Sequence, residues 1–207
     1  VERVKSLKKT SIKSIKKTLN IDINKEFFLV TLHSSTVGPD SPNLLAKETL
    51  GALNEFKSIP IVMSYSNTDA GGHVINKMKE NFCKEFPKIR VIKKTLGHEL
   101  YINCMRYASV VIGNSSSAVI EAPVVGVPTV NIGSRQKGRI MGPSIFSSDA
   151  KKVNIVKAIK KALNFNKSKK SVHLFGNGKT SDKILKYLKA FLEQKNNSSK
   201  EFYDIDF

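Results

Sequence analysis

Short apolar runs rich in valine and isoleucine alternate with amphipathic stretches along most of this 207-residue chain. Each run is nearly continuous in apolar residues, which is typical of strands that are covered on both faces. The runs lie at residues 26–32, 60–65, 89–93, 109–113 and 127–132. Strands that alternate with helices in this way predict an α/β fold built on a Rossmann-like, doubly wound parallel sheet.

Helical patterns fill the intervals between these runs. Apolar side chains recur there every three or four residues, as on a helix with one buried face. We expect helices at residues 44–56, 74–86, 98–108, 116–126, 150–164 and 180–193, and one opening helix at 4–19. The opening helix is rich in lysine, and it is expected to pack either on this domain or on a partner domain.

The pattern divides the chain into three parts. Residues 1–22 form an amphipathic helix and linker, 23–193 form the Rossmann-like domain, and 194–207 are a polar tail that we expect to be mobile. Hydrophobic residues make up 40% of the chain, which is enough for a buried core. The chain starts with Val1 where an initiator Met would stand, so we expect that a further segment precedes it.

Location and partners follow from composition. No apolar run approaches the roughly 18–20 residues of a membrane span, and the start has no apolar signal core. Cys83 and Cys104 form no CxxC pair, which favours a reducing cytoplasm.

The formal net charge of +18 suggests nucleic acid, but the lysines are spread over predicted helices without interleaved aromatic residues. We interpret them as solvated helix faces, and expect no nucleic-acid or membrane partner.

Polar, small or cationic residues follow every predicted strand. In an open parallel sheet, ligands bind beyond the carboxyl ends of the strands, so these loops share one edge. The loops are 31–35, 66–71, 94–97, 113–117 and 133–139. Together they predict a binding site at this edge.

The loop from Gly113 to Ser117, with Glu121 beyond it, suits a nucleoside diphosphate. A Gly- and Ser-rich turn that opens a helix presents free N–H groups, hydroxyls and the positive end of the helix dipole. Glu121 could accept two hydrogen bonds from a ribose diol. The alternative is a serine helix cap followed by a solvated glutamate.

Three further groups are candidates for the same site. Arg135 lies with Lys137 and Arg139 on a glycine-bounded loop that could bind phosphate, or could simply be exposed. His33 could donate to a phosphate, assist proton transfer, or serve the structure only. The pair at 67 and 69 (Asn, Asp) could contact the ligand or cap the next helix. No zinc-like spacing and no GxxxxGK[ST], GxGxxG or GxSxG motif occurs, so we expect no metal or cofactor.

The runs 66–71, 112–117 with 121–123, and 131–139 resemble the UDP-N-acetylglucosamine 2-epimerase family, and the likeness covers about residues 23–190. Gly-Asn-Ser-Ser followed by Gly-x-Arg-Gln-x-Gly-Arg is similar to the hydrolysing branch, which makes N-acetylmannosamine and UDP for sialic acids. The non-hydrolysing branch would carry Asp-Ser-Gly-Gly at 114–117. The family often has His-Pro-Val-Thr where this chain has His-Ser-Ser-Thr at 33–36.

The resemblance implies two Rossmann-like domains, as in B-type glycosyltransferases, with the site between them and this chain as the C-terminal, nucleotide-binding half. It implies that the following residues bind UDP: His33, Asn67, Leu96, Ser115, Ser116, Glu121 and Arg135. Of these, Ser115, Ser116 and His33 meet the diphosphate and Glu121 the ribose, while His33 and Arg135 also serve catalysis.

The implied reaction eliminates UDP to give a 2-acetamidoglucal, to which water adds with inversion at C2. The catalytic carboxylates belong mostly to the first domain, so this half is expected to be inactive alone. The full-length protein is expected to be a homo-oligomer. The alternatives are an epimerase of a di-acetamido UDP-sugar, half of a UDP-sugar glycosyltransferase, or a free-standing nucleotide-binding module.

Overall fold

A single parallel sheet of six strands organises the computed structural model, which describes residues 1–23, 26–35, 41–165 and 174–193. The spatial order is β3-β2-β1-β4-β5-β6. The strands are β1 (Phe28–Thr31), β2 (Ile61–Ser64), β3 (Arg90–Lys93), β4 (Val110–Gly113), β5 (Thr129–Ile132) and β6 (Ile145–Ser148). This is the strand order of a doubly wound dinucleotide-binding fold, so the predicted fold class is confirmed.

The sixth strand was not predicted from the sequence. β6 pairs in parallel with β5, with Thr129 opposite Ile145. It carries only Ile145 and Phe146 before two serines, and it is only partly buried at the edge of the sheet. An edge strand needs little apolar sequence, and this explains the weak signal.

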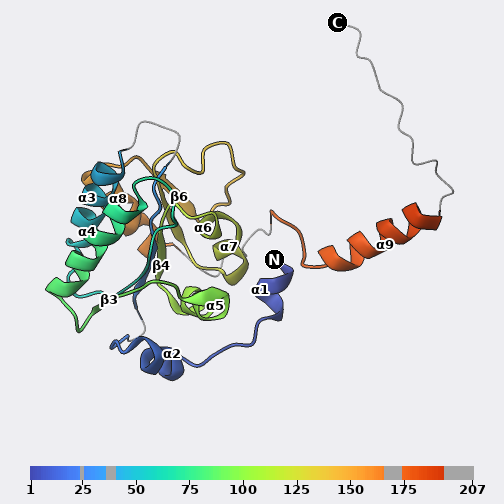
Figure 1. Cartoon of the computed structure of the whole chain (residues 1–207), viewed down its shortest axis with the longest axis horizontal. Coiled ribbons are helices and arrows are strands. Elements are labelled where there is room, and N and C mark those ends of the chain that lie inside the picture. Colours follow the sequence, from blue (N-terminus) through green and yellow to red (C-terminus); the bar gives the residue numbers. More distant parts are fainter. Residues whose placement is uncertain (24–25, 36–40, 166–173, 194–207) are drawn as a thin grey trace, which may run out of the picture.

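Helices cover both faces of the sheet (Figure 1). One face is covered by α3 (Pro42–Leu53), α4 (Gly72–Glu85) and α8 (Lys152–Leu163), and the other by α1 (Glu2–Ser6), α2 (Ile12–Leu19), α5 (Gly97–Tyr107), α6 (Ser117–Ile120) and α7 (Ala122–Val125). Strand side chains alternate between the two layers: Phe28 and Val30 enter the first core, and Leu29 enters the second.

The predicted opening helix at 4–19 is wrong as one continuous element. The chain leaves α1 in extended conformation at Leu7, and the side chain of Ser11 caps α2 by accepting from the Ser14 N–H (3.3 Å). Arg106 of α5 donates to the carbonyls of Val4 (2.7 Å) and Leu7 (3.1 Å). These contacts pack the N-terminal helices onto this domain. The division at residue 22 stays a prediction, and 194–207 lies outside the described residues.

The predicted helix at 116–126 is also interrupted. Glu121 joins α6 to α7, and Pro123 stands in the first turn of α7. Proline has no N–H to donate to the preceding turn, so a helix is broken or restarted there. Glu121 therefore lies at a junction and not in the second turn of a longer helix.

The last described helix, α9 (Thr180–Glu193), extends away from the sheet and its covering helices (Figure 1). None of its residues is buried, although it carries Ile184, Tyr187 and Phe191. Across the described part of the chain, no helix combines the length and apolar character that crossing a membrane requires.

The order of strands places a switch point between β1 and β4. The chain runs outward from β1 through β2 to β3, then returns to pair β4 with the other side of β1. Connections on the two sides leave in opposite directions, which opens a crevice at the carboxyl ends of β1 and β4. The predicted ligand loops that follow these two strands meet there.

Candidate functional site

Asn114, directly after β4, connects three of the strand-end loops. Its side chain accepts from the His33 N–H (2.8 Å) and donates to the His33 carbonyl (2.8 Å). Its own carbonyl accepts from Arg135 Nη1 (3.2 Å) and from Gln136 Nε2 (2.8 Å). The loops after β1, β4 and β5 are thus joined at the switch point, and His33 and Arg135 are brought to the same place.

Gly113 makes this close approach possible. Its φ of +139° lies in a region that favours glycine, and a Cβ atom at this position would lie 1.9 Å from the Thr31 carbonyl oxygen. Any other residue would force β1 and β4 apart at their carboxyl ends. The Gly113-Asn114 pair therefore sets the width of the crevice.

The ring of His33 is held in one orientation as a neutral donor. Its Nδ1 accepts from the Asn67 N–H (3.0 Å), so in the neutral ring the proton is on Nε2. Burial, together with the charges of Arg135 and Lys79, lowers the pKa of His33 to about 4 against the opposing effect of Asp69. This favours the predicted role as a hydrogen-bond donor over a role in proton transfer near neutral pH.

The residues after β2 do not cap α4 with their side chains. The N-cap is Gly71, which has no side-chain cap bond, while Asn67 Nδ2 donates to the carboxylate of Asp69. The capping interpretation is therefore wrong. Asp69 orients Asn67, and the Asn67 backbone in turn orients His33.

A chain of hydroxyl groups supports the serine loop from below. Ser117 Oγ contacts Ser115 Oγ (2.9 Å) and the hydroxyl of Tyr101 (2.8 Å). Thr31 Oγ1 donates to the Tyr101 hydroxyl (3.2 Å). Ser116 is the N-cap of α6 and makes no side-chain cap bond. α6 has only four residues, so it has no long helix dipole. This loop therefore offers a phosphate its free N–H groups and its hydroxyls.

Glu121 and the start of α5 lie side by side. Glu121 Oε1 is 3.5 Å from His98 Nε2, and both side chains remain partly exposed. Leu96, the N-cap of α5, is only 8% exposed as a residue and packs in the core. Only the backbone of this loop, and not the Leu96 side chain, can therefore make the predicted contact with a nucleotide.

The cationic loop after β5 is only partly directed to the site. Arg135 is half-buried and bound to Asn114, whereas Lys137 and Arg139 are exposed. Of the three cations, Arg135 is the one that the hydrogen bonds bring to the switch point.

Lys79 of α4 departs from the interpretation of the lysines as solvated. It is fully buried, and its Nζ donates to the carbonyls of Ser64 (2.7 Å) and Leu32 (3.3 Å). Burial lowers its pKa to about 7. Its spacing, four residues after Ile75 and three before Phe82, already placed it on the apolar face of the helix.

Buried polar atoms without a hydrogen-bond partner gather near this edge of the described structure. They include Ser34 Oγ, His98 Nδ1, Ser134 Oγ and Gln136 Oε1. Such atoms are rare in folded proteins and are typical of places where a ligand or water completes the structure. The sequence patterns include Asn114 and Gln136 but assign them no role, and they assign none to Tyr101 or His98, because these roles depend on contacts between distant segments.

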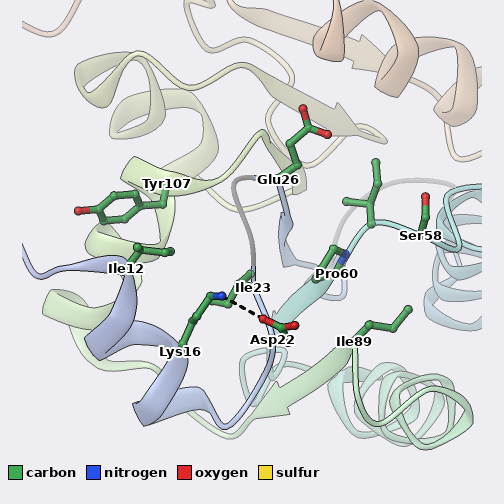
Figure 2. A pocket seen from close by; sticks show the side chains of 10 residues that line it. Ile12, Lys16, Asp22, Ile23, Glu26, Ser58, Pro60, Ile89 and Tyr107 are labelled. Atoms are coloured by element: carbon green, nitrogen blue, oxygen red, sulfur yellow. Dashed lines mark hydrogen bonds and ion pairs between the residues drawn. The ribbon is translucent and has the colours of Figure 1, made fainter.

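A cavity of about 960 Å³ lies at the opposite edge of the sheet, by the amino ends of β1, β2 and β3 (Figure 2). Its lining is mainly apolar and includes Ile23, Pro60 and Ile89, and Lys16 there is already paired with Asp22 (2.9 Å). It offers no convergent donors for an anion. The strand-end site is the better candidate because charge, donors and fold topology converge there.

Comparisons with known proteins show what this chain is similar to. The family model described as UDP-N-acetylglucosamine 2-epimerase matches residues 1–189. The polysialic acid biosynthesis protein P7 of Escherichia coli is 34% identical over 187 residues, which are 87% of this chain and 47% of that protein. The GDP/UDP-N,N'-diacetylbacillosamine 2-epimerase (hydrolyzing) of Campylobacter jejuni is 31% identical over 146 residues, 70% of this chain and 38% of that protein.

A solved structure shares the fold. The UDP-GlcNAc 2-epimerase of Methanocaldococcus jannaschii, in complex with UDP-GlcNAc and UDP, superposes with a TM-score of 0.63 at 20% identity. The superposition covers 86% of this chain and 49% of that one. The chain thus spans about half the length of the proteins it matches, or less.

Proposed function

Because this chain belongs to the UDP-N-acetylglucosamine 2-epimerase family, we propose that it is the UDP-binding, C-terminal half of a hydrolysing UDP-N-acetylglucosamine 2-epimerase. The observation that carries the proposal is the junction at Asn114, which brings His33 and Arg135 together at the switch point. A neutral donor, a cation and free N–H groups there form a receptor for a diphosphate.

In the proposed reaction, a base removes the proton at C2 of the sugar while the bond from C1 to the UDP oxygen breaks. UDP departs with the electron pair, and water then adds across the resulting double bond. On this chain, the Arg135 guanidinium and His33 Nε2–H would stabilise charge as it grows on the leaving diphosphate. The base and acid at the sugar would come from the other half of the protein.

The nucleoside would lie between α5 and α6. The Glu121 carboxylate is partly exposed, so one of its oxygens can accept from the ribose diol while the other faces His98. The backbone of the Leu96 loop would border the base. Ser115, Ser116 and Asn67 would then complete the binding set on the diphosphate side.

The alternative substrate is a di-acetamido UDP-sugar. The 31% identical Campylobacter protein, named for N,N'-diacetylbacillosamine, favours it, whereas the 34% identical P7 protein is named for polysialic acid biosynthesis. Both sugars would place their acetamido groups against the other half.

The proposal extends to a cytoplasmic, homo-oligomeric enzyme that needs neither metal nor cofactor.

Ligand-detected NMR or calorimetry tests the binding proposal on the 207-residue chain, with CMP as the control. We expect UDP to bind weakly, because one wall of the site is missing, and CMP to bind less well. If a folded sample binds no UDP at millimolar concentration, the site assignment is wrong.

A further inference from the structure

Lys79 is a buried cation without a counter-charge among the described residues. Arg90, also buried, pairs with Glu85 (3.2 Å) and lies over the rings of Phe82 and Phe86. Within the described part of the chain, the Lys79 ammonium donates to two backbone carbonyls and to no carboxylate. An unpaired buried charge is costly, so its retention calls for a compensating partner.

Lys79 lies directly beneath the strand-end site. The carbonyls that it binds belong to Leu32, next to His33, and to Ser64, the last residue of β2. Its positive charge acts on the His33 ring, whose pKa it lowers. A negative charge bound at His33 would therefore act on Lys79 with the opposite sign.

The ionisable groups on the surrounding elements do not supply that negative charge. They are His33 after β1, Asp69 after β2, Glu80 and Cys83 on α4, Arg90 and Lys93 on β3, Lys47 and Glu48 on α3, and Arg135 after β5. The Asp69 carboxylate accepts from Asn67 Nδ2 and acts on His33. Glu80 accepts from the hydroxyl of Tyr65, and Glu48 accepts from the Lys152 N–H. Burial raises the pKa of the Cys83 thiol to about 11, so it is uncharged near neutral pH.

We propose that Lys79 is a positioning residue of the diphosphate site, and that it takes up a proton when the diphosphate supplies its missing counter-charge. The inference rests on the proposed function. In the free protein, burial holds the pKa of Lys79 near 7, so Lys79 is uncharged in a fraction of the molecules at pH 7 to 8. An anion nearby favours the charged form, so binding is coupled to protonation.

Two consequences distinguish this role from a purely structural one. The affinity for UDP should fall as the pH rises above 7, because the proton is then harder to acquire. Binding at pH 8 should take up a fraction of a proton, although UDP is fully ionised there, since its last pKa is about 6. His33 contributes much less at pH 8, because its pKa starts near 4, further from that pH than the pKa of Lys79.

Calorimetry of the 207-residue chain at pH 8, in buffers of different ionisation enthalpy, measures the proton uptake with UDP. Inorganic pyrophosphate, which itself keeps a proton at this pH, is compared for affinity alone. We expect uptake in the native chain and in Lys77→Met, an exposed lysine on the same helix, and none in Lys79→Met. The Lys79→Met affinity at pH 7 should be roughly tenfold lower, as for loss of one nearby charge. Circular dichroism checks the fold of each variant.

The outcomes separate the two proposals. UDP binding without proton uptake by the native chain overturns the Lys79 role and leaves the nucleotide site standing; this test needs no variant. Proton uptake on UDP binding, with no preference for UDP over pyrophosphate, keeps the Lys79 role and removes the nucleotide assignment. Equal uptake by Lys79→Met and the native chain also overturns the inference, and a folded chain that binds neither ligand overturns both proposals.

Discussion

At the scale of the residue, Glu121 is the group that should distinguish a nucleotide from a plain diphosphate. We expect Glu121→Gln to lower UDP affinity about tenfold or more, since hydrogen bonds to a charged group contribute about 1.5–3 kcal/mol. Pyrophosphate affinity should hardly change, because pyrophosphate has no ribose. Titration calorimetry measures both, and Glu99→Gln, an exposed acid on α5, is the control. Equal losses for the two ligands would assign Glu121 to the fold.

His33 should make the protein less stable in acid. Its pKa is lowered from 6.5 to about 4 in the folded chain, so between these values the unfolded chain binds more protons. The free energy of unfolding should therefore fall as the pH drops from about 6.5 to 4, by at most about 1.4 kcal/mol per unit. In urea titrations, the fall should be smaller for His33→Gln. Parallel pH profiles for the two proteins would contradict this.

Residue roles divide into those that the sequence could predict and those that it could not. Arg135 and His33 follow strands, so the ligand-binding rule for parallel sheets located them in advance. Asn114 matters because the oxygen and the nitrogen of its side-chain amide both bond to the His33 backbone, more than eighty residues away, and no local pattern encodes that. Lys79 was misread because abundant lysines elsewhere suggested exposure, although its helical spacing indicated a buried face.

At the scale of the element, the contact between β1 and β4 should tolerate no side chain at Gly113. We expect Gly113→Ala to destabilise the chain by about 3 kcal/mol or more, since its Cβ would overlap backbone. Gly126 is the matched control: its φ is +76°, but nothing lies within 4 Å of an added Cβ. Gly126→Ala should cost only about 1 kcal/mol, from backbone strain alone. Thermal unfolding compares the two, and similar losses would refute the steric account.

Elements with a strong internal pattern were predictable, and those shaped by their neighbours were not. The four inner strands, β1, β2, β4 and β5, are mostly apolar because helices cover both faces of the sheet. These strands and the edge strand β3 were located from their short apolar runs. The breaks at Leu7 and Glu121 come from a serine cap and a proline that compete with helical periodicity. β6 needs the existing edge of β5 to form, so its own residues carry little signal.

At the scale of the whole molecule, catalysis should require more than this chain. We expect residues 1–207 to show no turnover of UDP-N-acetylglucosamine, because a positioned base at the sugar contributes about 10²–10⁴-fold and the strand-end loops offer no carboxylate pair. The complete two-domain protein should release UDP and N-acetylmannosamine. NMR in deuterated water should show deuterium at C2 of the product. Steady turnover by the 207-residue chain would overturn the half-enzyme interpretation.

The ladder between β1 and β4 also has a consequence for folding. It joins strands whose first paired residues are Phe28 and Val110, so a long loop must close before it can form. The pairs of β1 with β2 and of β2 with β3 are closer in sequence. Since the site spans the β1–β4 ladder, a chain that has assembled only β1 to β3 has no crevice. A ligand bound there would stabilise the pairing of β1 with β4, which joins the two halves of the sheet. It would therefore slow unfolding by separation of these halves.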